Sequence, residues 1–187
     1  GSVTLANTQA GLAVNLQAGG TGTIVGSAGS QTVSTMAALT GALTLTDTGV
    51  GTTDAVSVIN ARPVAGLNWG NGNNIVSSGY ETVNISTNGA GAATTLVLGT
   101  VAIAPDTIAG GAAANGVGTA NFSGSNIVTV GAITASDINA SGLTTGSSTG
   151  ITTFSMGAPA VGVKTITGSA GNDSLVGDTS TTIDGGA

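Results

Sequence analysis

The chain contains no cysteine and no histidine, and it has very few charged or aromatic residues. Charged side chains make up 5% of its 187 residues, against roughly a quarter in typical domains. Without cysteine there is no disulfide framework. Without histidine or cysteine, the commonest general base and the most reactive nucleophile are both missing. Because the acids are also scattered along the chain, the sequence predicts that the protein is not an enzyme.

Positive charge is nearly absent. Arg62 and Lys164 are the two basic residues, and the net charge is -6. Phosphate neutralisation and polybasic membrane anchoring both need clustered Lys and Arg, so we expect no nucleic-acid partner and no such anchor. No apolar run approaches the roughly 18 residues of a membrane span, so we expect no membrane insertion. The acid surplus favours a cation as the partner.

The main pattern in the sequence is a recurrence of apolar residues at every second position. Apolar and polar residues alternate over short segments, and residues typical of turns, such as Gly, Asn, Ser and Asp, separate them. The segments are LAVNL (12–16), LTLTD (43–47), AVSVI (55–59), TVNIS (82–86), TLVLG (95–99), NIVTV (126–130) and VKTIT (163–167). The pattern predicts an all-β protein built from strands of about five residues. A short helix within 33–43 is an alternative for that segment alone.

Three all-β architectures fit this spacing: a sandwich, a barrel and a β-solenoid. The frequent Gly and Asn residues suit tight corners, and the small aliphatic residues suit a narrow interior. Aromatic side chains, which usually anchor a sandwich core, are limited to Trp69, Tyr80, Phe122 and Phe154. We therefore predict a right-handed parallel β-helix or β-roll-like solenoid. A β-sandwich for about the first 160 residues is the alternative.

The strongest chemical motif lies near the C-terminus. Residues 168–176 read GSAGNDSLV and match the calcium-binding nonapeptide G-G-x-G-x-D-x-U-x, with Ser169 in place of the second glycine. Glycines let the backbone turn tightly and present carbonyl oxygens, Asp173 adds a carboxylate, and Leu175 should face the interior. Ca²⁺ takes six to eight oxygens, so a neighbouring turn must complete the site. The predicted metal ligands are Gly168, Ala170, Gly171, Asp173, Asp178 and Asp184.

The repeat continues imperfectly after this motif. Ile183 follows Leu175 by eight residues instead of nine, and Thr182 stands where another Asp is expected. A further turn opens at Asp184-Gly185-Gly186, so we expect more repeats in the parent protein. We divide the chain into an irregular β-solenoid segment, 1–167, and the truncated start of calcium-binding repeats, 168–187.

Three segments resemble one known family. VKTITGSAGNDSLVG (163–177) resembles the entry into the calcium-binding repeats of RTX-type proteins, especially bacterial S-layer proteins. SSGYETVNIST (77–87) and SDINASGLTT (136–145) resemble further segments of those S-layer proteins. The resemblance implies type I secretion, location at the cell surface, and calcium-dependent folding and assembly of copies into a lattice. Cell-surface polysaccharide is a second implied partner. A stalk or binding segment of a secreted RTX adhesin is the alternative function.

The remaining acids have simpler interpretations. Asp47 and Asp54 flank DTGVGTTD, where we expect a solvated turn whose Asp caps its own backbone, with a second calcium site as the alternative. Glu81 is expected to be exposed at a strand entry, although it could bind calcium or pair with Arg62 or Lys164. Asp106 and Asp137 are expected in similar turns.

Two further features have both a structural and a functional interpretation. Trp69 is expected to cover one end of the coil, and stacking on a sugar ring is the alternative. Asn84, Asn121 and Asn139 each begin an N-x-[ST] triplet. In a chain this rich in Asn, Ser and Thr such triplets arise by chance, so we assign them no glycosylation.

Overall fold

The computed structural model describes residues 2–8, 10–17, 21–26, 29–36, 39–49, 53–61, 74–87, 95–104, 118–144, 152–159 and 163–186. Every regular element within these ranges is a β-strand, and no helix there is long and apolar enough to cross a membrane. Arg62, Trp69 and Asp106 lie outside the described residues, and so does the interpretation of each.

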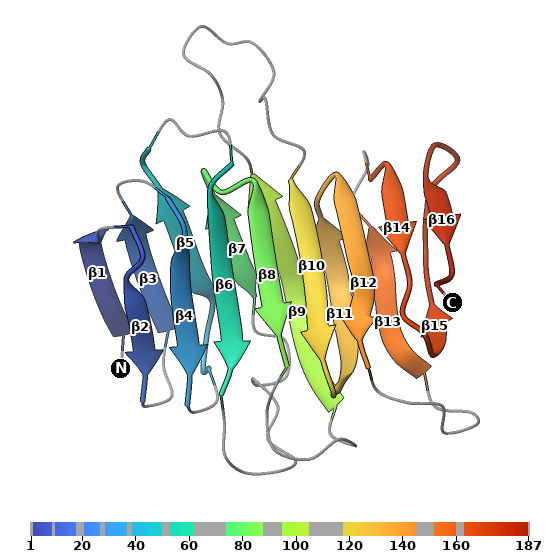
Figure 1. The fold of residues 1–187 in the computed structure, drawn as a ribbon, viewed down its shortest axis with the longest axis horizontal. Coiled ribbons are helices and arrows are strands. Elements are labelled where there is room, and N and C mark those ends of the chain that lie inside the picture. Colours follow the sequence, from blue (N-terminus) through green and yellow to red (C-terminus); the bar gives the residue numbers. More distant parts are fainter. Residues whose placement is uncertain are drawn as a thin grey trace, which may run out of the picture.

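The described residues form sixteen strands in two parallel sheets, and the chain alternates between them (Figure 1). The first sheet holds the odd-numbered strands, in the order of the chain: β1 Ser2–Thr8, β3 Thr21–Gly26, β5 Leu43–Asp47, β7 Ile75–Ser78, β9 Thr95–Ala104, β11 Ile127–Thr134, β13 Thr152–Pro159 and β15 Asn172–Ser174. We call it the odd sheet.

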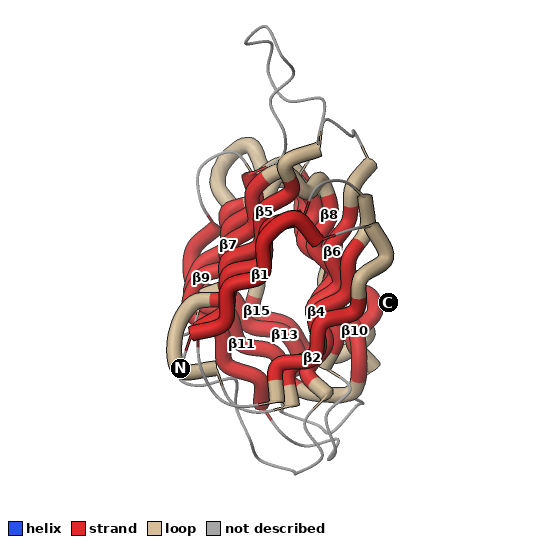
Figure 2. Tube along the Cα trace, turned by 90° about the vertical axis from the view of Figure 1, so that its left-hand side faces the viewer, coloured by secondary structure: helices blue, strands red, loops and turns tan. Residues whose placement is uncertain are grey.

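The even sheet holds the remaining strands, again in chain order: β2 Ala13–Leu16, β4 Gln31–Thr35, β6 Ala55–Asn60, β8 Thr82–Ser86, β10 Thr119–Gly124, β12 Asp137–Leu143, β14 Thr165–Thr167 and β16 Thr182–Asp184. Figure 2 looks along the stack and shows the two sheets as its opposite walls. The first and last turns lie at opposite ends of the long axis (Figure 1).

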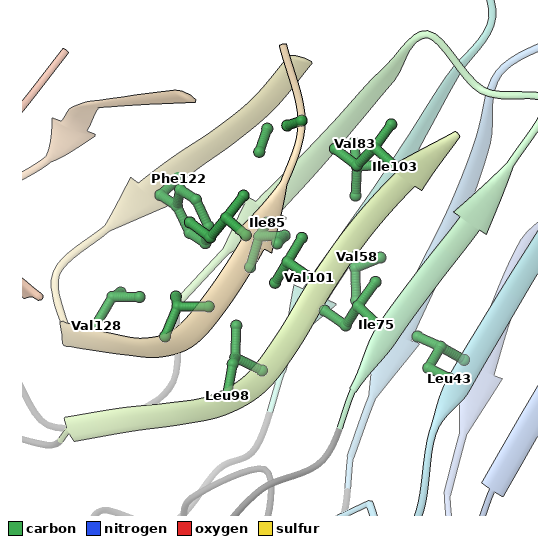
Figure 3. Close-up of a cluster of buried hydrophobic side chains, with 14 of the residues drawn as sticks. Leu43, Val58, Ile75, Val83, Ile85, Leu98, Val101, Ile103, Phe122 and Val128 are labelled. Atoms are coloured by element: carbon green, nitrogen blue, oxygen red, sulfur yellow. The ribbon is translucent and has the colours of Figure 1, made fainter. Parts of the chain in front are cut away.

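The alternating sequence pattern determines which side chains enter the interior. In β4, β5 and β6 every second residue is buried, and the buried residues of the two sheets face each other. The resulting core is aliphatic, and Figure 3 shows Leu43, Val58, Ile75 and Val101 within it. The three described aromatic rings, Tyr80, Phe122 and Phe154, are also buried. Burial of these apolar faces is the main source of stability that the fold offers.

The pairing confirms the all-β solenoid prediction. Strands pair in parallel throughout, from β1 with β3 to β14 with β16, whereas a sandwich would be built largely from antiparallel pairs. The sandwich alternative is therefore wrong. The segment 33–43 contributes to β4 and β5, and its described residues form no helix.

The number of residues in one winding of the solenoid varies because some corners carry insertions. Register places Thr119 beside Asp137, 18 residues later, and Thr165 beside Thr182, 17 residues later. The turn from Thr82 to Thr119 takes 37 residues. The shortest windings, of 17 and 18 residues, are therefore about as long as two nonapeptides. β15 and β16 continue the same two sheets as the strands of segment 1–167.

Candidate metal centre

The predicted calcium motif forms the corner between β14 and β15 on the last turn. The Gly168 N–H donates a hydrogen bond to the Asp184 carbonyl oxygen, with an N···O distance of 2.7 Å. This bond joins the start of the corner to the end of β16. The start of the motif, 168–171, and the glycine-rich segment 184–186 therefore lie against each other.

Asp173 organises this corner with its carboxylate. Its Oδ1 accepts hydrogen bonds from the Ser169 hydroxyl at 2.7 Å and from the Phe154 N–H at 3.1 Å, and its Oδ2 accepts one from the Ser169 N–H at 2.7 Å. In the register of the odd sheet, Asp173 pairs with Phe154. The Asp173 side chain thus follows Phe154 in an inward-facing column of the odd sheet. Its hydrogen bonds to Ser169 fix the conformation of the corner. Charge-assisted bonds of this kind are stronger than neutral ones.

Glycine at two positions lets oxygen atoms converge on the corner. A methyl group added to Gly168 would lie 2.5 Å from both Asp173 Oδ2 and the Gly185 carbonyl oxygen. One added to Gly186, whose φ is +82°, would overlap the Ser169 carbonyl oxygen and lie 2.9 Å from that of Gly168. One carbonyl and one carboxylate oxygen therefore lie against Gly168, and two carbonyl oxygens lie against Gly186, closer than a side chain at either position would allow.

These donors fit calcium in chemical type. Ca²⁺ prefers carboxylate and backbone carbonyl oxygens and binds six to eight of them in flexible geometry. The carbonyls of Gly168, Ser169 and Gly185, with the Asp173 carboxylate, would hold the ion and supply part of that number. The remaining oxygens would come from water or from another winding of the solenoid.

Asp178 does not join this group. It lies in the turn before β16, at the opposite corner of the same winding. Its Oδ1 accepts hydrogen bonds from the Ser180 N–H at 2.8 Å and the Ser180 hydroxyl at 2.7 Å. The Thr181 hydroxyl lies 3.0 Å from the same oxygen and 3.0 Å from the Val163 carbonyl oxygen, and it donates to one of them at a time. This geometry caps a turn.

The other predicted ligands lie near Asp173 without forming an acidic cluster. Asp184 is exposed, and its Oδ1 accepts a hydrogen bond from the Gly186 N–H at 3.1 Å. The Gly171 N–H donates to the Ser169 hydroxyl oxygen at 3.1 Å, and Ala170 is exposed. Within the described ranges, no group of three or more Asp or Glu side chains lies close enough together to hold a metal ion. Any ion here would depend on carbonyl oxygens.

Sequence reasoning missed the role of Ser169. The serine stood out only as a departure from glycine in the motif, yet it is buried and gives Asp173 two of its three hydrogen bonds. It also missed the carbonyls of Ser169 and Gly185. The pair Gly185-Gly186 was the available signal, because it opens the next repeat. Leu175 packs against the core, as the motif predicts.

A second group of acids lies where β5 and β7 lead into β6 and β8. Asp47 is 5% exposed and Glu81 is 6% exposed, so the expectation of solvated residues is wrong for both. Asp47 Oδ1 does accept a hydrogen bond from the Gly49 N–H at 2.7 Å, which confirms the predicted cap. Glu81 precedes β8 and accepts a bond from the Asp54 N–H at 2.8 Å. In each carboxylate one oxygen accepts a hydrogen bond from a corner N–H group, which offsets part of the cost of burying the charge.

Tyr80 is buried within this acidic corner. Its burial and the nearby carboxylates of Asp47 and Asp54 raise the pKa of its phenol from 10.0 to about 12. Desolvation contributes most, since the ionised phenolate is poorly solvated inside the protein, and the two negative charges add to it.

The raised pKa predicts a loss of stability in alkali. Unfolded Tyr80 ionises near pH 10, whereas folded Tyr80 stays neutral until about pH 12. Stability is therefore complete below pH 10 and falls by about 2–3 kcal/mol as the pH rises to 12. Because the chain has one tyrosine, phenolate absorbance reports this group alone. Denaturant titrations at several pH values should show the loss, and Tyr80→Phe should remove it. An absorbance midpoint near 10 in the folded protein would contradict the prediction.

Comparison of the chain with protein-family models, curated proteins and solved structures finds no match.

Proposed function

We propose that the protein is a structural component of a bacterial surface layer and that calcium promotes its folding and its assembly. The observation that supports this most is the last turn, where the Asp173 carboxylate and the Gly185 carbonyl lie against Gly168 and two further carbonyl oxygens lie against Gly186. This arrangement lies in a solenoid whose short windings approach two nonapeptides in length. The motif resemblance to RTX-type S-layer proteins leads to the same function.

The composition suits a passive, assembled role. Two basic residues and no histidine or cysteine leave little for catalysis, and the described acids act as caps of corners and turns. The outer face of the even sheet is lined with Thr, Ser and Asn on successive strands. For example, Asn121 Nδ2 donates to Asn84 Oδ1 at 2.9 Å. Neutral, ordered faces of this kind allow close packing of copies with little charge repulsion.

Calcium binding should depend on one corner of the last winding. We expect the chain to bind calcium with a dissociation constant of about 10⁻⁴–10⁻³ M, as extracellular modules do. Asp173→Asn should weaken binding about tenfold or more, because it removes one carboxylate oxygen and its charge. Isothermal titration calorimetry measures both values.

Asp178→Asn provides the matched control. It makes the same chemical change on the same winding, but at the opposite corner, so calcium affinity should stay within about twofold of the unaltered chain. Equal weakening by both variants would show that overall charge, and not the corner, attracts the ion. Absence of any calcium heat, also in a longer chain carrying the following repeats, would refute the proposed role of calcium.

Electron microscopy distinguishes the surface layer from the adhesin stalk. The stalk is the second candidate because the stacked windings extend along one axis with their ends far apart (Figure 1). With calcium, a surface-layer protein should form sheets or regular arrays that a chelator disperses. Isolated rods under the same conditions would favour the stalk.

A further inference from the structure

The outer face of the even sheet is a regular array of neutral polar side chains. It lies along the side of the solenoid and faces the viewer in Figure 1. In β4, β6 and β8 every second residue is directed to this face. Neighbouring strands are about 4.8 Å apart, so residues in register form columns with this spacing. Register aligns the central column as Ala13, Thr32, Ser57, Asn84, Asn121, Asn139, Thr167 and Asp184.

Two further columns flank the central one on the same face. The first contains Ala55, Thr82, Thr119, Asp137 and Thr165. The second contains Asn15, Ser34, Ile59, Ser86 and Ser123. Hydroxyl and amide groups therefore predominate in all three columns, and their members on β4, β6, β8 and β10 are half-buried.

Charge is nearly absent from this face. From β2 to β10 the three columns contain no charged residue. On β12 they carry Asp137, whose carboxylate accepts a hydrogen bond from the Thr165 hydroxyl. Most of the other described acids lie at corners, as Asp47, Asp173 and Asp178 do. A chain of net charge -6 thus presents a broad face with little charge, and the cores of protein interfaces are likewise depleted of charged residues.

The side chains of this face can form hydrogen bonds with an identical face. Asn121 Nδ2 donates to Asn84 Oδ1 at 2.9 Å, which uses one of the two hydrogens of the Asn121 amide. Asn side chains carry two donor hydrogens and two acceptor lone pairs, and Ser and Thr hydroxyls both donate and accept. Donors and acceptors therefore remain for a partner, and a second copy offers both. A face with charges of one sign would instead repel its own copy.

The face is also large enough for a specific contact. It spans eight strands, and about five residues of each strand at about 3.3 Å per residue give about 600 Å² per copy. Two such faces in contact bury about 1,200 Å², which is the lower limit of the range for specific interfaces. We therefore expect a reversible contact.

The odd sheet does not offer an equally regular face. In β11, Val130 and Ile133 are both buried with two residues between them, so the alternation shifts within the strand. The three glycines Gly99, Gly131 and Gly157 lie against one another in this part of the sheet. The outward columns of the odd sheet are therefore interrupted, and those of the even sheet are the better surface for association.

A neutral polysaccharide is the other partner that a face with so little charge suits. Sites for small molecules and sugar units are mostly concave, whereas this face is the open surface of a sheet. The three described aromatic rings, which would be available for stacking on a sugar if they were exposed, are buried. These observations favour a second copy of the chain.

We propose that two copies of the chain pack face to face through the outer faces of their even sheets. The contact is isologous, because the same columns of Thr, Ser and Asn meet on both copies, and it closes after two copies. Because the face runs along the side of the solenoid, additional windings would extend it and would not cover it. The contact is one element of the proposed self-assembly and rests on that proposal for its biological setting.

Charges placed on the face test the arrangement. Sedimentation velocity of the 187-residue chain in calcium should show a monomer–dimer equilibrium. Ser57→Asp and Asn84→Asp should each weaken dimerisation about tenfold or more, because each puts a negative charge on both sides of the contact. Asn84→Asp is nearly isosteric and keeps the oxygen that accepts from Asn121. An equimolar mixture of Asn84→Asp and Asn84→Lys should dimerise more tightly than either variant alone, since the two faces then carry opposite charges.

Ser155→Asp is the matched control for Ser57→Asp. Both serines are half-buried and lie within strands, but Ser155 belongs to β13 of the odd sheet. Dimerisation of Ser155→Asp should therefore stay within about twofold of that of the unaltered chain. Circular dichroism and denaturation midpoints should show that all variants stay folded.

Three results would overturn the proposal. They are a chain that is monomeric at every concentration, even-sheet variants that dimerise as well as the unaltered chain, and equal weakening by Ser155→Asp. Affinity electrophoresis through gels containing dextran tests the other partner. Retardation of a monomeric chain that Asn84→Asp abolishes would assign the face to a neutral polysaccharide, and not to a second copy.

The face contact and the calcium proposal can fail separately. A monomeric chain that still binds calcium would refute the face contact and leave the calcium proposal intact. Dimers that form equally with calcium and with a chelator, and that Ser57→Asp weakens, would support the face contact and count against calcium-dependent assembly.

Discussion

Gly79→Ala should destabilise the protein by about 3 kcal/mol, because alanine meets two obstacles at this position. The φ of Gly79 is +84°, in the left-handed region that L side chains rarely adopt. A methyl group there would also overlap the Asp47 carbonyl oxygen and lie 3.1 Å from Asp47 Cβ. The backbone has little freedom to retreat, since the Gly79 N–H donates to the Ala104 carbonyl oxygen of the next winding at 2.8 Å.

Alanine substitutions at two other glycines distinguish the backbone strain from the steric overlap. Gly11 has a φ of +78° with open space around it, so Gly11→Ala should cost about 1 kcal/mol from backbone strain alone. Gly185 has open space without a left-handed φ, so Gly185→Ala should stay within about 0.5 kcal/mol of the original. Chemical denaturation followed by circular dichroism gives all three values. If Gly79→Ala cost no more than Gly11→Ala, the contact with Asp47 would be irrelevant to stability.

The strands were predictable from the sequence because alternation reflects one buried face. All seven segments expected as strands overlap one, although β6, β9 and β11 run beyond the expected segments. The strands that were missed are mostly short, glycine-rich or bounded by polar residues, as β3 (TGTIVG) and β15 (NDS) illustrate. Such segments form strands because they pair in parallel with strands of the neighbouring windings. Their own β-propensity contributes little.

The N-x-[ST] triplets belong to a structural repeat that could not be detected from the sequence alone. Asn84, Asn121 and Asn139 stand beside one another in register, on the outer face of β8, β10 and β12. The strands TVNIS, TANFS and DINAS therefore repeat one outward pattern at unequal intervals of 37 and 18 residues. Insertions at the corners conceal the repeat in the sequence. The triplets are by-products of this ladder, in which polar residues occupy every second, outward position.

The candidate metal site was predictable in its location and only partly in its composition. The nonapeptide identified the 168–171 corner because glycine and aspartate spacing follows local backbone geometry. It could not show that Asp178 lies across the winding, since that depends on where the short last turn closes. The burial of Asp47 and Glu81 could not be predicted either, because it arises where corners stack. The Asp54 N–H donates to Glu81 Oε2, 27 residues later, and Asp47 lies against Gly79 of the next winding.

The largest expected loss of stability is that of Phe122→Ala, about 4 kcal/mol. Phe122 is buried on β10, and its ring centroid lies 5.0 Å from that of Phe154 on β13, with an interplanar angle of 44°. The pair joins the even sheet to the odd sheet across the interior of successive windings. Removing one ring leaves a cavity and also loses the ring contact, which is worth about 0.5–1.5 kcal/mol.

A solenoid should respond to this change locally before it unfolds as a whole. Each winding contacts only its neighbours, so a weak junction in the middle uncouples the windings on its two sides. Hydrogen exchange of Phe122→Ala should therefore show lost protection first in β10 to β13, while β4 to β6 remain protected. Phe122→Leu keeps most of the volume and should cost about 1.5 kcal/mol or less. Equal losses for the two variants, or a uniform loss of protection, would show that the aromatic pair does not couple the windings, and the double variant with Phe154→Ala measures that coupling directly.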